Sequence, residues 1–105
     1  MGFFKQFKVR VRHGRGDEDK FNAFWKDGNY DGVMRAYKEM SEADQNEFKA
    51  KLNEVDDDYN FGDKLAESED LVSAQMIATD YTDELKREYV QAFEAMGLNF
   101  EVEEK

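Results

Sequence analysis

The residues best suited to chemistry in this chain are carboxylates, and one stretch spaces them as a calcium-binding loop would. Asp27, Asn29 and Asp31 occupy positions 1, 3 and 5 of such a loop, and Gly32 occupies position 6. The twelfth position requires a bidentate glutamate, but here it is Lys38. Because lysine supplies no oxygen ligand and adds a positive charge, we predict a structural turn and no metal site.

A second candidate loop begins at Asp56 and has oxygen-bearing side chains at positions 1, 3, 5 and 12. Its glycine, Gly62, falls at position 7, and Phe61 takes position 6, where the sharp turn needs glycine. This loop therefore also lacks a residue that calcium binding requires. The sequence therefore predicts neither a metal ion nor another cofactor.

The residues of enzyme active sites are scarce. His13 is the only histidine, and there is no cysteine, so thiolate nucleophiles, zinc–thiolate sites and disulfides are excluded. The chain contains no nucleophile-elbow motif, no phosphate-binding glycine loop and no dinucleotide-binding pattern. We predict that the protein is not an enzyme.

Charge is the most informative property of the composition. The chain has 15 basic and 25 acidic residues, which gives a net charge of −10. Residues 1–15 hold five basic residues and no acid, whereas residues 54–84 hold eleven acids and a single lysine, Lys64. A field of this sign repels nucleic acid and attracts cationic surfaces. We predict a basic protein surface as partner and no direct binding to nucleic acid; the alternative is that the acidity only keeps the chain soluble.

The predicted partner-binding site lies within the acidic stretch, with two aromatic side chains as candidate anchors. Its residues are Asp56, Asp57, Asp58, Tyr59, Phe61, Asp63, Glu67, Glu69 and Asp70.

No run of the sequence approaches the roughly 20 apolar residues of a membrane span. The start, MGFFKQFKVRVRHGRG, lacks the apolar middle of a signal peptide. We therefore expect a soluble, cytoplasmic protein without membrane contact and leave its oligomeric state open.

The hydrophobic pattern predicts one small α+β domain covering residues 1–105. Helices are predicted at about 17–26, 31–40, 42–55 and 83–96. The last helix has the clearest pattern: Leu85, Tyr89, Phe93 and Met96 recur at helical spacing between a Thr82 cap and a terminating Gly97.

Short strands are predicted at both ends of the chain. Apolar Phe7, Val9 and Val11 alternate with cations, and apolar Leu98, Phe100 and Val102 alternate with Asn99, Glu101 and Glu103. Because opposite charges on neighbouring strands attract, we predict that the two strands form a short antiparallel sheet packed against the four helices. The stretch 71–79 fits either a helix or a third strand, and we favour the strand.

One helical hairpin resembles a unit of a known repeat family. Trp25, Gly28, Tyr30, Ala36 and Tyr37 fall in the order that tetratricopeptide repeats use over about residues 23–40. The resemblance implies two antiparallel helices. It covers about a fifth of the chain and is not repeated, whereas a solenoid needs about three stacked units. We interpret it as a local likeness of packing.

Three classes of function fit these features. In size and charge the chain is similar to phage and mobile-element anti-defence proteins, including anti-CRISPR and anti-restriction inhibitors that imitate DNA. We therefore predict a non-enzymatic inhibitor that blocks a basic, nucleic-acid-binding partner such as a nuclease. The alternatives are an immunity protein or antitoxin for a cationic toxin, and a small structural, assembly or scaffold protein.

Overall fold

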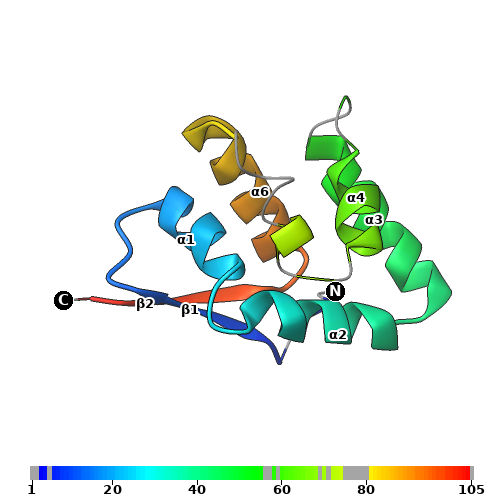
Figure 1. Ribbon diagram of the computed structural model, residues 1–105, viewed down its shortest axis with the longest axis horizontal. Helices are drawn as coiled ribbons and strands as arrows, with labels where there is room; N and C mark the ends of the chain where they lie inside the picture. The colour runs from blue at the N-terminus through cyan, green and yellow to red at the C-terminus, as the bar shows by residue number, and fades with distance from the viewer. Residues whose placement is uncertain are drawn as a thin grey trace.

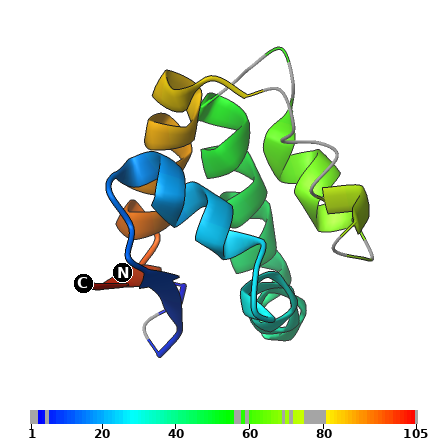
Figure 2. The same ribbon diagram turned by 60° about the vertical axis from the view of Figure 1, so that its left-hand side comes forward.

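The computed structural model describes residues 3, 4, 6–55, 58, 60–68, 70, 72–74 and 81–104, and most of them are helical (Figure 1). In chain order the elements are β1 (Lys8–Arg12), α1 (Asp17–Phe24), α2 (Asn29–Glu39), α3 (Glu42–Val55), α4 (Phe61–Glu67), α6 (Asp83–Ala95) and β2 (Asn99–Glu103). Helices α6, α3 and α4 stand in a row, and the small sheet lies at one end of α6 (Figure 2). Four of the helices lie within about two residues of the predicted bounds, whereas α4 was not predicted.

The sheet corrects the predicted fold, because β1 and β2 pair in parallel and not antiparallel. The register sets Arg10 opposite Glu101 and Arg12 opposite Glu103. The expected attraction between the strands is present, since Lys8 Nζ lies 3.0 Å from Glu101 Oε1. Alternation of charged and apolar residues looks the same for either strand direction, so the sequence pattern could not reveal the direction.

The helices decide how the strands run. After β1 the chain turns back into α1, and after α6 it turns at Gly97, whose φ of 99° suits glycine, and returns as β2 (Figure 1). Helices α1 and α6 pack together and run in the same direction (Figure 1). Because each strand runs against its neighbouring helix, and the two helices run together, β1 and β2 must be parallel. Parallel strands need a long crossover connection, and the helices supply it.

The face of the sheet predicted to be buried is only partly covered. Val9 and Val11 are buried, and Phe7 and Phe100 are half-buried. Val102 remains 40% exposed. Only two strands form the sheet within the described chain, so β2 has no strand on its outer side to shield that residue. The predicted third strand at 71–79 lies mostly outside the described residues, and its described part, 72–74, is helical.

The hydrophobic core is built from aromatic rings contributed by several helices. Phe24 of α1 stacks on Phe93 of α6 with ring centroids 4.7 Å apart, and Phe21 lies 5.9 Å from Tyr89. Both pairs join α1 to α6. Because aromatic pairs at these separations attract beyond the effect of burying their area, they hold the sheet-proximal helices together.

The stretch between α1 and α2 forms a tight turn. Asp27 and Gly28 have φ of 54° and 76°, and the Asn29 side-chain amide donates a 2.8 Å hydrogen bond to the Ala23 carbonyl. Asn29 is buried and used to close the turn. Helices α1 and α2 cross steeply, since Figure 2 looks nearly along α2 while α1 runs across the view. The antiparallel packing implied by the tetratricopeptide resemblance is therefore not observed.

The N-terminal segment explains a glycine within α2. A side chain at Gly32 would overlap the ring of Phe7, whose Cζ would lie 2.7 Å from the new Cβ. The ring therefore packs directly on the backbone of α2, and Gly32 provides the room.

The predicted Thr82 cap is confirmed, because Thr82 Oγ1 accepts a 3.2 Å hydrogen bond from the Leu85 N–H. No described helix combines the length and apolar character needed to cross a membrane.

Candidate functional site

The structure describes five of the nine predicted partner-binding residues. The exposed ones are Asp58, Asp63, Glu67 and Asp70. The buried one is Phe61. The other predicted residues, Asp56, Asp57, Tyr59 and Glu69, lie outside the described residues.

Phe61 belongs to the core and not to the surface. Its side chain is fully buried, and its ring centroid lies 4.5 Å from that of Tyr89 and 6.4 Å from that of Trp25. The role of exposed anchor that the sequence assigned to Phe61 therefore does not fit this structure. Its position explains why α4 starts here: the ring fixes the first turn of α4 on the aromatic core.

Helix α4 is also attached to α3 along its backbone. The Asp63 N–H donates a 3.2 Å hydrogen bond to Asn53 Oδ1. Gly62 is buried, and a side chain there would overlap the carbonyl group of Lys49 in α3. This close contact holds α4 in place, so the carboxylates of Asp63 and Glu67 are presented from a fixed helix.

The Asp70 carboxylate is exposed but already accepts hydrogen bonds from a nearby residue of the chain. It accepts hydrogen bonds from the Ser73 backbone N–H at 2.8 Å and from the Ser73 hydroxyl at 3.1 Å. These hydrogen bonds, the backbone one first, stabilise the charged form and lower the pKa of Asp70 below its ordinary value. Asp70 thus remains an anion, but part of its hydrogen-bonding capacity is already used.

Further carboxylates lie at the same end of the molecule. The C-terminal end of α3 and the N-terminal ends of α4 and α6 all point away from the sheet (Figure 1). These ends carry exposed Glu54 on α3, Asp63 on α4, and Asp83 and Glu84 on α6, and exposed Glu88 lies one turn further along α6. Tertiary structure therefore enlarges the predicted acidic site with residues that are some 30 positions apart in the sequence.

Two carboxyl groups are brought together where α1 meets α6. The carboxylate of Asp83 raises the pKa of Glu18 above its ordinary value, mainly by like-charge repulsion and then through a hydrogen bond between the two side chains. Both residues are exposed. The packing of α1 on α6 thus brings two acidic groups together at the start of both helices, where helix dipoles favour anions.

Glu18→Gln is expected to increase the free energy of unfolding at neutral pH, because it removes the charge that Asp83 repels. The raised pKa means that the native state holds this proton more tightly than the unfolded state, so the wild-type protein loses stability as the pH rises through that value. The gain should vanish below about pH 4, where Glu18 is protonated in both states. Urea denaturation across this pH range measures it, with Glu104→Gln as the exposed control. A gain of equal size at every pH would contradict the assignment.

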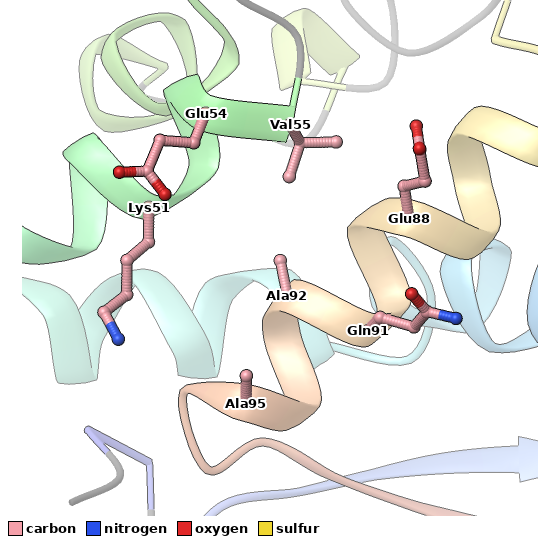
Figure 3. Close-up of a pocket in the computed structure, with 7 residues that line it drawn as sticks. All are labelled: Lys51, Glu54, Val55, Glu88, Gln91, Ala92 and Ala95. Carbon is pink, nitrogen blue, oxygen red and sulfur yellow. The ribbon is translucent and has the colours of Figure 1, made fainter.

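A groove with a volume of about 470 Å³ lies between α3 and α6 (Figure 3). Lys51, Glu54 and Val55 line it from α3, and Glu88, Gln91, Ala92 and Ala95 line it from α6. On each helix the further positions lie three, four or seven residues after the first, so each set forms one face. Figure 3 shows Ala92 and Ala95 pointing from α6 toward the space beside Val55 and Lys51. Because their methyl groups are short, the space between the helices stays open.

The groove is apolar at its floor and acidic at its sides. The carboxylates of Glu54 and Glu88 come from opposite helices (Figure 3). In the described part of the chain, neither forms an ion pair, whereas Lys51 Nζ lies 3.8 Å from Glu47 Oε1. The negative charge of both side chains is therefore available to a partner.

The comparisons with known proteins found no similarity that could name this site. No protein-family model, no curated protein and no solved structure matches the chain. Among the described residues, no group of three histidine or acidic side chains is arranged to hold a metal ion. The candidate site is thus defined by its geometry and charge alone.

Sequence reasoning missed the part of the site on α6. The signal was present, because Glu88, Gln91, Ala92 and Ala95 recur at helical spacing beside the apolar stripe of the last helix. Spacing alone could not show that this second face meets α3. That required the antiparallel packing of two helices separated by the acidic stretch.

Proposed function

We propose that the protein is a non-enzymatic, acidic binding protein that blocks a basic, nucleic-acid-binding partner. The proposal covers inhibitors of the anti-CRISPR and anti-restriction kind that imitate DNA. The observation that carries it is the gathering of exposed carboxylates from α3, α4 and α6 at the end of the molecule away from the sheet. Within the described residues, Glu54, Asp63, Glu67 and Glu88 take part in no ion pair.

Electrostatic attraction would raise the rate at which such a surface associates with a partner and would favour basic partners over others. A protein with a net charge of −10 is steered toward a groove lined with lysine and arginine. Binding releases the anions that accompany that groove, just as DNA binding releases counterions. Carboxylates fixed on helices can therefore occupy the positions that phosphates would take, and the partner can no longer bind nucleic acid.

A second candidate is an immunity protein or antitoxin, and the groove between α3 and α6 favours it. A compact epitope needs a desolvated centre surrounded by polar groups, and the groove is lined by apolar Ala92 and Val55 together with Glu54 and Glu88. The two candidate functions differ in whether nucleic acid competes with the protein for its partner. Nucleic acid should displace the inhibitor of a nucleic-acid-binding protein, whereas a toxin bound outside its nucleic-acid site should stay bound.

The immobilised protein is expected to retain a basic nucleic-acid-binding protein from nuclease-treated bacterial lysate, and duplex DNA should release it. Neutralising three carboxylates of this end together, by Asp58→Asn, Asp63→Asn and Glu84→Gln, should weaken binding of that protein at least tenfold. The salt dependence should also become shallower, because fewer ionic contacts remain. Mass spectrometry identifies the captured protein, and titration at low and high salt measures its affinity.

A matched control changes the net charge equally at other exposed positions. Glu39→Gln, Glu42→Gln and Glu104→Gln remove three charges outside the acidic end, and the combined variant should lose less than threefold in affinity. Unchanged binding after neutralisation of the acidic end, or a captured protein that DNA does not displace, would refute the proposed function. Self-association in ultracentrifugation without any such partner would instead support an assembly role.

A further inference from the structure

The α3–α6 groove has the shape of a helix-packing seam without a third helix. From Glu88 to Ala95, the lining of α6 follows an i, i+3, i+4, i+7 pattern, which is the pattern of a helix face that contacts a neighbouring helix. This face extends over about 10 Å at 1.5 Å per residue. Its small side chains, Ala92 and Ala95, would let another backbone approach closely. Its volume of about 470 Å³ falls within the range of about 300–1,000 Å³ typical of ligand sites, so it can take several side chains.

The sides of the groove determine the charge of what it can hold. Glu54 on α3 and Glu88 on α6 are both exposed, and neither takes part in an ion pair within the described chain. Among the described residues that line the groove, Lys51 is the only cation, and its Nζ already lies 3.8 Å from Glu47 Oε1. An acidic or neutral segment would leave both carboxylates unpaired, whereas arginine or lysine at the edges of a docked helix would pair with them.

We infer that this groove docks a cationic amphipathic helix of the partner. Its small apolar face would lie on Val55, Ala92 and Ala95, and its arginine or lysine side chains would reach Glu54 and Glu88. The inference rests on the proposed function, because it takes the partner to be basic. It adds a definite mode of recognition: a helix lying in a groove, with charge selecting its edges.

A synthetic helical peptide of about 14 residues, with alanine and leucine on one face and arginine at its edges, is the probe. It should shift the NMR methyl resonances of Val55, Ala92 and Ala95 more than those of other residues. A peptide of the same composition with a scrambled order should bind at least fivefold more weakly, because it keeps the charge and loses the apolar face. Glu88→Gln should weaken binding of the helical peptide about threefold and reduce its salt dependence.

Ala95→Leu is the decisive variant, since it fills the groove and leaves the charge unchanged. The peptide should bind at least tenfold more weakly to it. Ala95 is exposed, so the variant should fold, and its circular dichroism spectrum checks this. Ala50→Leu is the matched control, because Ala50 is also exposed on a helix but does not line the groove. It should bind like the wild-type protein.

The possible outcomes separate this inference from the proposed function. Equal binding of the ordered and scrambled peptides, or wild-type affinity of Ala95→Leu for the ordered peptide, would overturn the groove inference. The proposed function would remain, because it rests on the exposed carboxylates. Concentration-dependent dimerisation that Ala95→Leu abolishes would assign the groove to a second copy and would also overturn it. Peptide docking in the groove, together with a lysate partner that DNA does not displace, would retain the groove and refute the proposed function.

Discussion

Phe61→Ala is expected to lower the free energy of unfolding by about 3–5 kcal/mol, which is the usual range for truncating a fully buried phenylalanine. The ring is completely buried and lies against Tyr89 and Tyr81, with centroid distances of 4.5 Å and 5.8 Å. Its removal would leave a cavity where α4 joins the aromatic core. Because small domains have stabilities of about 5–15 kcal/mol, the variant should be close to unfolding. Urea denaturation followed by circular dichroism measures the change.

Two companion variants distinguish a core role from a binding role for Phe61. Phe61→Leu preserves most of the apolar volume, so it should cost about 1–1.5 kcal/mol and leave partner binding unchanged. Asp63→Asn lies two positions along the same helix and is exposed, so it should change stability by less than about 0.5 kcal/mol. A stable Phe61→Ala variant that has lost its partner would contradict the core assignment and restore Phe61 as an anchor.

Gly62→Ala is expected to destabilise the protein by about 2–3 kcal/mol, although alanine is the better helix former by about 1 kcal/mol. A Cβ at this position would overlap the Lys49 carbonyl oxygen and would lie 2.9 Å from Asn53 Oδ1. The first obstacle is backbone in the middle of α3, so it cannot rotate aside. Helix α4 would have to move away and lose the hydrogen bond from Asp63 to Asn53. Hydrogen exchange should therefore become faster in α4 before it does in α6.

Gly16→Ala provides the control for this glycine substitution. A Cβ at Gly16 would meet no atom within 4 Å, and the φ of 173° is extended backbone that any residue can adopt. Its effect on stability should stay within about 0.5 kcal/mol. If Gly62→Ala were as stable as Gly16→Ala, the close packing of α4 on α3 would be disproved, and the fixed placement of Asp63 and Glu67 with it.

Local features of the fold were accessible from the sequence because they depend on residues close together in the chain. The Thr82 cap and the terminating Gly97 both lie where the spacing predicted them. The helix at 83–96 was clear for the same reason, since an apolar stripe at helical spacing needs no knowledge of its partner. Helix α4 was missed, because its seven residues give less than two full turns of pattern.

The sequence by itself determined the charge, the helical faces, the caps and the absence of cysteine. Only the tertiary structure decided the parallel direction of the strands, the burial of Phe61, and the placement of Glu54 and Glu88 on opposite sides of one groove. Each of these depends on how helices far apart in the chain pack against each other. Periodicity reports which face of an element is apolar, whereas packing decides which elements meet and in which direction they run. The charge of the surface could therefore be predicted from the sequence, whereas its shape could not.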